Sequence, residues 1–186
     1  MQAFIISDQE YQNEEFTRLH DLVSHYLSEK GMLVEETRIA KDDLAFCKGC
    51  FGCWVKKPGE CVINDAMAQI NQNFIKSDLT VYLCPVVFGQ FSANIKNALD
   101  RWIPNILPFF EIRPDGSTMH PARYSVYPRQ LMIGYGKNLS PEDTGLFLDI
   151  TAKHRRNVDV LIYQGNDSEI TRALAQIEPK KVGDLL

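Results

Sequence analysis

Residues 79–84 read "LTVYLC", a β-prone run of six residues that ends at Pro85. Its β-branched and aromatic side chains and its short length are typical of a strand. Because the run is mostly apolar, we expect both faces of this strand to be buried. Strands of that kind belong to parallel sheets that helices cover on both sides.

The segments around this strand alternate between the patterns of strands and of helices. Four further apolar runs predict strands at residues 3–6, 32–39, 130–136 and 158–164. Apolar residues at steps of three and four predict helices over 13–31, 67–75, 92–102, 141–156 and 167–177. The chain is therefore predicted to be an α/β protein with a five-stranded parallel sheet between helices.

In such folds a ligand binds where the strands end, on their carboxyl side. The segments at this edge are 7–12, the residues after Ile39, 84–90 and 134–138. A stretch rich in cysteine begins shortly after Ile39. The sequence thus places these cysteines beside the expected ligand site.

Residues 47–61 read "CKGCFGCWVKKPGEC" and hold four of the five cysteines of the chain. Two residues separate Cys47 from Cys50 and Cys50 from Cys53, and seven separate Cys53 from Cys61. Four thiolates from such a compact run are the usual ligands of an iron–sulfur cluster. The spacing predicts a 4Fe–4S cluster on Cys47, Cys50, Cys53 and Cys61.

Two other interpretations of these thiols stay open. Structural zinc also takes four thiolates, although it more often draws two CxxC pairs from separate knuckles. Alternatively, the cysteines are small buried residues or a redox-active thiol pair. Cys84 is a separate case, because it ends an apolar strand and is expected to be simply buried.

The composition limits the classes of protein to consider. With 186 residues, 45% of them hydrophobic, we expect one domain over 1–186 with a cysteine-rich insertion at 47–61. The net charge of −4 gives no reason to expect nucleic acid or a membrane as a partner. No segment resembles a signal peptide or approaches the roughly 20 apolar residues of a membrane span. A cytoplasmic protein is expected, and clustered cysteines there are more often metal ligands or redox centres than disulfides.

Two segments carry a family resemblance, "CKGCFGCWVKKPGECVINDAM" (47–67) and "PVVFGQFSANIKNALDR" (85–101). Together with the order of strands and helices, they resemble the NAD(P)H-dependent FMN reductases, and most of all the iron–sulfur flavoproteins. The resemblance extends from the first strand to at least Gly136. It implies a flavodoxin-like three-layer sandwich and a compact cysteine motif that carries a 4Fe–4S cluster.

The resemblance also implies an activity and its cofactors. The protein would be an FMN-dependent oxidoreductase or electron-transfer flavoprotein, with NAD(P)H as electron donor. Its partner would be a small-molecule redox substrate or an electron-transfer protein, and it would form a homodimer or homotetramer. The rival hypothesis is a non-enzymatic metal-binding or assembly protein that keeps the fold but has lost the flavin.

Site residues follow from the resemblance as well. The loop after the third strand would line the flavin ring with Pro85, Val86, Val87, Phe88 and Gly89, and the ring's other edge would meet Gly134, Tyr135 and Gly136. Because the cofactor carries out hydride transfer, no catalytic residue is predicted.

The segment expected to hold the flavin phosphate, residues 7–17, departs from the family. It has no glycine and no basic residue, and it carries four carboxylates. Glu14 and Glu15 stand where the free N–H groups of a helix would favour an anion. Ser7, Gln9 and Thr17 remain as donors, so we expect weak FMN binding.

For three other features, a structural role is expected before a role in binding the cofactor. Asp100 and Arg101 are expected to form a solvated pair on their helix rather than to contact the cofactor. Trp54 is expected to shield the thiols or to pack against its neighbours, and His120 to be an exposed loop residue that could instead cover the flavin.

The turn-rich segment 111–126 is predicted to be an excursion or a hairpin beyond the core of the sheet. It follows a group of large apolar residues, Trp102, Ile106, Phe109 and Phe110. An exposed apolar patch of this size usually marks an interface, so a homodimer is predicted through this region.

Overall fold

The computed structural model describes residues 1–114, 116–154 and 158–177. The strands are β1 (Gln2–Asp8), β2 (Leu33–Ile39), β3 (Leu79–Val87), β4 (Gln90–Phe91), β5 (Glu111–Ile112), β6 (Thr118–Met119), β7 (Arg129–Tyr135) and β8 (Val158–Tyr163). The helices are α1 (Glu14–Glu29), α2 (Gly52–Val55), α3 (Met67–Lys76), α4 (Ala93–Asp100), α5 (Pro141–His154) and α6 (Asp167–Gln176), with a 3₁₀ turn η1 (Ile103–Asn105).

Five parallel strands form the main sheet in the order β2-β1-β3-β7-β8. This confirms the predicted α/β flavodoxin-like fold. The order reverses direction between β1 and β3, and ligands bind at this switch point in doubly wound sheets. A ligand site is therefore expected at the carboxyl ends of β1 and β3.

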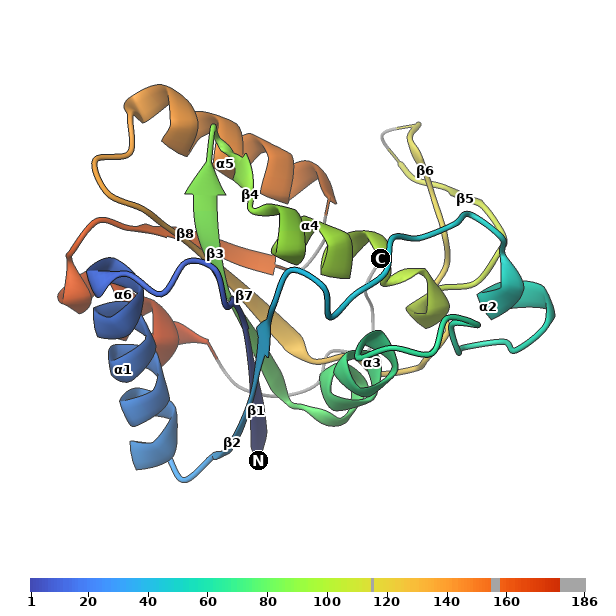
Figure 1. Ribbon diagram of the computed structural model, residues 1–186, viewed down its shortest axis with the longest axis horizontal. Helices are drawn as coiled ribbons and strands as arrows, with labels where there is room; N and C mark the ends of the chain where they lie inside the picture. The colour runs from blue at the N-terminus through green and yellow to red at the C-terminus, as the bar shows by residue number, and fades with distance from the viewer. Residues whose placement is uncertain (115, 155–157, 178–186) are drawn as a thin grey trace.

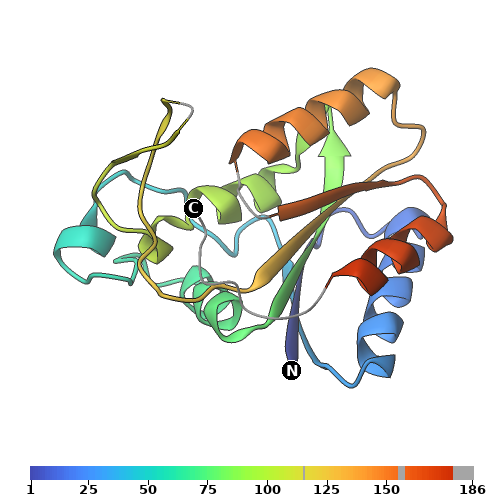
Figure 2. The same ribbon diagram turned by 180° about the vertical axis from the view of Figure 1, so that it is seen from behind.

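Each face of the sheet has its own hydrophobic core, and helices cover both faces (Figure 1). Side chains alternate along β1, so Ala3 and Ile5 pack on the side of α1 and α6, while Phe4 and Ile6 pack on the side of α3 and α4. Figure 2 shows the α1 and α6 layer from behind. The three-layer arrangement follows from this two-sided burial.

Two strands differ from the sequence prediction. β3 continues through Pro85 to Val87. Its pairing with β1 ends at Tyr82, so Pro85 lies where β3 has a neighbour on one side only, and proline is tolerated at such edge positions; on the other side Pro85 still pairs with Tyr135. β2 lies at the edge of the sheet and is polar, with Leu33 66% exposed. The expectation that every strand is buried on both faces is wrong for β2.

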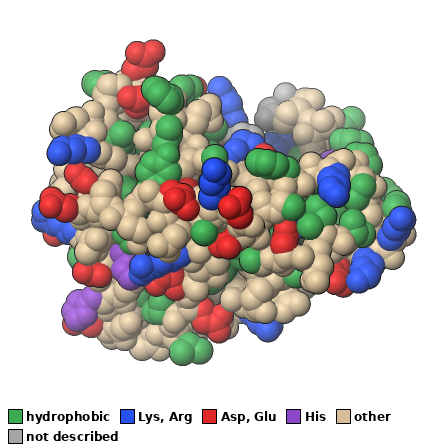
Figure 3. Space-filling model, in the orientation of Figure 1, with side chains coloured by type: hydrophobic (Ala, Val, Ile, Leu, Met, Phe, Trp, Pro, Cys, Tyr) green, Lys and Arg blue, Asp and Glu red, His purple; other side chains and the backbone are tan. Residues whose placement is uncertain are grey.

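The cysteine-rich stretch and the β5–β6 hairpin lie together at one end of the molecule, far from α1 and α6 (Figures 1 and 2). Ring contacts join them, because the Trp54 ring lies 4.9 Å from the ring of His120. Hydrophobic side chains and Lys or Arg side chains both appear on the surface over this end (Figure 3). The predicted hairpin is thus present in the excursion.

Within the residues that the structure describes, no helix combines the length and hydrophobicity that crossing a bilayer requires.

Candidate functional site

At the switch point, the residue that ends β1 is a fully buried acid, Asp8. Its carboxylate accepts hydrogen bonds from the Ser92 hydroxyl at 2.6 Å, the Asn94 side-chain amide at 2.9 Å and the backbone N–H of Glu10 at 2.9 Å. Asp8 thereby ties the end of β1 to the start of α4. The chain's own carboxylate occupies these donors, which would otherwise be available to an anionic ligand.

The three predicted phosphate donors do not converge. Ser7 is buried, and among the described residues its hydroxyl has no hydrogen-bond partner. Gln9 is exposed, and Thr17 donates its hydroxyl to the backbone oxygen of Asn13. The Asn13 side chain caps α1 by accepting from the N–H of Phe16 at 2.9 Å. The N-terminus of α1 is thus already partly satisfied.

The segment predicted to line the flavin ring is a tight hairpin rather than an open loop. β3 and β4 pair Val87 with Gln90, so Phe88 and Gly89 form a two-residue turn. Both have positive φ, 50° and 69°, as a type I′ turn requires. The Phe88 side chain is 90% exposed. This turn presents an aromatic ring to solvent beyond the end of β3, next to α5, at the cost of backbone strain.

The other predicted ring-binding residues lie mostly inside the fold. Pro85 and Gly134 are buried where β3 pairs with β7, and Val86 is half-buried. The buried Tyr135 donates its hydroxyl to the backbone oxygen of Tyr11 at 3.0 Å. Burial raises the pKa of Tyr135, so this phenol stays neutral. Gly136 alone among these residues lines a pocket at the edge of the sheet.

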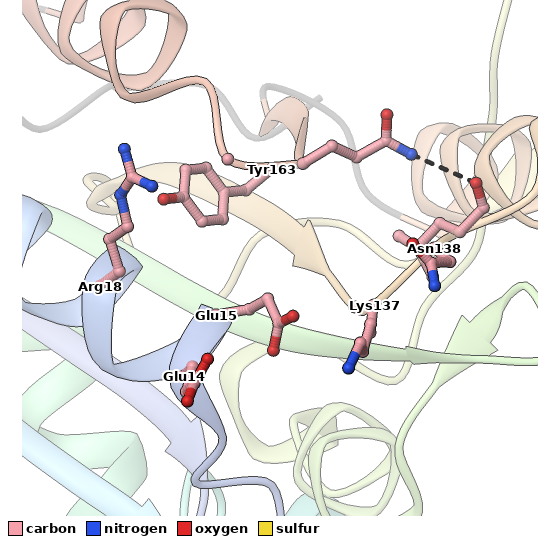
Figure 4. Close-up of a pocket in the computed structure, with 10 residues that line it drawn as sticks. Glu14, Glu15, Arg18, Lys137, Asn138 and Tyr163 are labelled. Atoms are coloured by element: carbon pink, nitrogen blue, oxygen red, sulfur yellow. Dashed lines mark hydrogen bonds between the residues drawn. The ribbon is translucent and has the colours of Figure 1, made fainter.

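That pocket is open, has a volume of about 580 Å³, and lies where α1 begins and β7 and β8 end (Figure 4). Glu14 and Glu15 line one wall, and Lys137 lies across from them, on the loop that follows β7. Arg18 lines the pocket as well but is bonded to Asp167 at 2.8 Å. Lys137 is therefore a cation that the sequence analysis missed, because only the fold brings it to the start of α1.

The four clustered cysteines occupy the segment between β2 and α3, around the short helix α2. Cys47 and Cys50 are exposed, and Cys53 and Cys61 are half-buried. Burial raises the pKa of the Cys53 thiol, and the charges of Cys61, Cys47 and Cys50 raise it further. Cys53 is therefore the cysteine that lies within electrostatic reach of the other three.

These thiols supply the right donor set for a four-thiolate centre, but they stand apart. Across the described ranges, no group of three or more His, Cys, Asp or Glu side chains is arranged to hold a metal ion. Because Cys47 and Cys50 are exposed, their side chains have room to rotate and bring their sulfurs closer to Cys53.

Arg101 is not the solvated residue that the sequence suggested. It is 2% exposed, forms an ion pair with Asp65, and donates to the backbone oxygen of Ala45 at 2.9 Å and to Cys61 Sγ at 3.3 Å. Burial lowers its pKa, but Asp65 and Cys61 raise it by more, so the guanidinium stays charged. The burial of Arg101 is indicated by its position: it follows Asn97 by four residues and Ala98 by three, so it lies on the same side of α4 as these two buried residues. Asp100, by contrast, is half exposed and pairs with Lys96.

Trp54 and His120 pack against each other beside the cysteines. The Trp54 ring stacks on Phe51 at 5.2 Å, and its N–H donates to the backbone oxygen of Ile106 at 3.0 Å. His120 contacts the backbone oxygen of Phe109 through Nδ1 at 2.8 Å and is half-buried. The expected exposed loop histidine is thus part of an aromatic cluster. Cys84 is fully buried, as predicted.

The predicted apolar patch is smaller than expected. Trp102 packs into the core against Phe74, with ring centroids 5.2 Å apart, and Ile106 is half-buried. Phe109 and Phe110 are 65% and 72% exposed.

The chain resembles known proteins in its sequence. A family model described as NADPH-dependent FMN reductase matches residues 3–109. An iron–sulfur flavoprotein of Archaeoglobus fulgidus is 30% identical over 88 residues, which are 47% of this chain and 39% of that protein. An iron–sulfur flavoprotein of Methanocaldococcus jannaschii is 32% identical over 77 residues, 41% of this chain and 38% of that protein. The matches thus span about two fifths of the length of these relatives.

Solved structures share the fold across nearly the whole chain. An NAD(P)H:quinone oxidoreductase from Methanothermobacter marburgensis superposes with a TM-score of 0.65 at 15% identity, covering 94% of this chain and 93% of that one. An azoreductase from Bacillus anthracis gives a TM-score of 0.60 at 11% identity, covering 94% and 92%. At these identities the likeness concerns the fold alone.

Proposed function

This chain belongs to the NADPH-dependent FMN reductase family, and on that basis we propose that it is a flavin-dependent oxidoreductase with a metal centre on its clustered cysteines. The observation that carries the proposal is the family match over residues 3–109, which includes the switch point, the cysteine stretch and the Phe88 hairpin. Reduced NAD(P)H is the proposed electron donor. A small-molecule redox substrate or an electron-transfer protein is the proposed acceptor.

The chain's residues are proposed to bind and orient FMN at the carboxyl edge of the sheet. The exposed ring of Phe88 offers a stacking surface for the isoalloxazine. The buried Ser7 hydroxyl, which has no partner within the described residues, is a donor for a ribityl or phosphate oxygen. Lys137 is the cation available to the phosphate. The flavin, when bound, supplies the electron-transfer chemistry.

The cysteines are proposed to hold a 4Fe–4S cluster. Their number and spacing match four-thiolate ligation, and two relatives carry the name iron–sulfur flavoprotein. In this reading the chain would hold the flavin at the carboxyl ends of the strands and the cluster on the segment between β2 and α3.

A visible spectrum of anaerobically purified protein tests the flavin. Bands of oxidised flavin that bleach on addition of NADPH are the expected result. Broad iron–sulfur absorbance without flavin, before and after incubation with FMN, would contradict the oxidoreductase proposal and favour the metal-binding or assembly role. The sequence comparisons do not favour that rival, because they match a reductase family and flavoproteins.

Metal analysis tests the cluster. Anaerobically handled protein should contain about four irons per chain, as a cubane cluster requires. Cys50→Ala should remove most of the iron, whereas Cys84→Ala should keep it, because Cys84 lies buried in β3. One zinc per chain and no iron would show that the site is structural zinc instead.

A further inference from the structure

The cysteine insertion is fastened at both of its ends to a single buried cation, Arg101. Before the insertion, Ala45 accepts from Arg101 Nη1 at 2.9 Å. After it, Cys61 Sγ accepts from Nη2 at 3.3 Å, and Asp65 forms the ion pair. One guanidinium at the end of α4 thus holds the chain on either side of Cys47, Cys50 and Cys53.

Asp65 extends this clamp. Its carboxylate accepts from the N–H of Ala45 at 3.0 Å and from the N–H of Met67 at 3.1 Å. The side chain of Asp65 is only 13% exposed, and that of Arg101 only 1%. One turn earlier on α4, Asn97 donates to the backbone oxygen of Leu44 at 2.9 Å. The two ends of the insertion are therefore joined by buried polar contacts. Removing one charged partner would leave the other buried and unpaired.

The contact with sulfur sets Arg101 apart from an ordinary structural ion pair. Among the four clustered thiols, Cys61 is the one whose sulfur accepts a hydrogen bond from a charged donor within the described residues. Hydrogen bonds to ligand sulfurs and nearby net charge set the stability and the reduction potential of a thiolate-bound centre. A buried guanidinium is only weakly screened by solvent, so both effects are large at this position.

We propose that Arg101 is a positioning residue of the metal centre: it clamps both ends of the cysteine insertion and donates a charged hydrogen bond to the ligand sulfur of Cys61. Two consequences follow. The clamp preorganises the four thiols, so metal binds more tightly. The hydrogen bond from Arg101 to Cys61 Sγ favours the more reduced, more negative state of the centre, so the reduction potential is higher than it would be without this bond. This inference rests on the metal centre proposed above.

The test removes the clamp without leaving a buried charge behind. The double variant Asp65→Asn with Arg101→Met neutralises both partners, and such replacements often preserve folding. The matched control is Arg129→Gln with Asp159→Asn, which breaks an Arg–Asp pair of 2.8 Å between the start of β7 and β8. Circular dichroism and thermal unfolding establish that each variant folds. Iron, sulfide and zinc content, metal affinity and the reduction potential of the reconstituted centre are then measured.

We expect the double variant to bind metal about 10- to 100-fold more weakly, as other changes around metal ligands do, and to have a more negative potential. The control should match the wild type in both. Arg101→Lys provides a second variant that keeps the buried positive charge. Lysine has a single ammonium in place of the planar, forked guanidinium, so it cannot contact Ala45 and Cys61 at the same time. It should lose metal affinity while its potential stays nearer the wild type.

Wild-type affinity and potential in either folded variant would overturn the role of Arg101 while leaving the metal centre intact. If the wild-type protein binds neither iron nor zinc after anaerobic reconstitution, the proposed metal centre itself fails, and this inference with it. The wild-type measurement therefore distinguishes the two failures.

Discussion

Single charged residues decide how well this chain can hold a flavin phosphate. Glu14 and Glu15 line the pocket at the start of α1, and Lys137 faces them from the loop after β7 (Figure 4). Negative side chains at a helix N-terminus compete with a phosphate for the same favourable field. The balance between these three side chains should therefore appear directly in FMN affinity.

We predict that Glu14→Asn with Glu15→Thr tightens FMN binding roughly 3- to 30-fold, since each charge near a helix end contributes about 0.3–1 kcal/mol. Lys137→Gln should weaken it. Titration of apoprotein followed by flavin fluorescence measures both. Riboflavin is the control ligand, because it lacks the phosphate and its affinity should change with none of these substitutions. Equal changes for riboflavin and FMN would show that the phosphate lies elsewhere.

The hydrogen bond between His20 and Glu36 should make the stability of the fold depend on pH. His20 Nε2 lies 2.9 Å from Glu36 Oε2, and this hydrogen bond raises the pKa of His20. The same bond lowers the pKa of Glu36 to about 2. A raised histidine pKa stabilises the fold below about pH 6.5, and this contribution is lost as the pH rises through the folded value. The lowered Glu36 pKa stabilises it above about pH 4.5, and that contribution is lost as the pH falls toward 2.

His20→Asn should therefore reduce the free energy of unfolding most between about pH 5 and 6, and least above pH 8. Urea unfolding at both ends of this range measures the difference. His25→Asn is the matched control on the same helix, because the His25 and Glu29 side chains are 75% and 64% exposed. A pH-independent effect of the His20 substitution would contradict the assigned pairing.

At the scale of elements, the β3–β4 hairpin has a strained backbone at a residue that is proposed to contact the flavin. Phe88 is a non-glycine residue at φ 50°, with its side chain almost entirely in solvent. Packing within the described fold thus gives little reason for phenylalanine in the left-handed region. A residue that costs stability there and exposes an aromatic ring is well explained by a ligand that stacks on it.

Phe88→Asn should stabilise the apoprotein by about 1 kcal/mol, because asparagine tolerates the left-handed region, and should weaken flavin binding. Gly89→Ala should destabilise the fold by more than about 1 kcal/mol, since φ is 69° and a Cβ would lie 2.7 Å from Leu146 Cδ2. Thermal unfolding and flavin titration measure these effects. Unchanged flavin affinity in folded Phe88→Asn would exclude a stacking role for this ring.

At the scale of the whole molecule, the end that carries the cysteines also carries exposed apolar side chains. Phe109 and Phe110 precede the β5–β6 hairpin, and Ile112 on β5 is 81% exposed. The β5–β6 hairpin lies at the same end of the molecule as α2 (Figure 1). We propose that a homodimer covers these side chains, because such clustered apolar side chains usually mark an interface.

Light scattering at micromolar concentration should give the mass of a dimer. Phe109→Glu with Phe110→Glu should give a monomer, since two charges on each protomer would be buried unpaired at the interface. Leu146→Glu, a half-exposed position on α5, is the surface control and should remain dimeric. A monomeric wild-type protein would contradict the interface.

The sequence by itself determined the fold class and the cysteine motif. Apolar runs mark β1, β3 and β7 because burial on two faces demands continuous apolar strands, and the half-buried edge strand β8 is apolar as well. The spacing of Cys47, Cys50 and Cys53 is local, so it can be recognised without any tertiary information. Local signals of this kind survive in sequence because they act between residues a few positions apart.

Only the tertiary structure decided which distant charges meet. Arg101 lies 40 residues from Cys61 and 36 from Asp65, and its burial depends on how α4 packs against the end of β2 and the segment that follows it. Lys137 faces Glu14 and Glu15 only because β7 ends and α1 begins at one edge of the sheet. A charged residue looks solvated in sequence, since exposure is the common case, and its partners across the fold reveal when it is not.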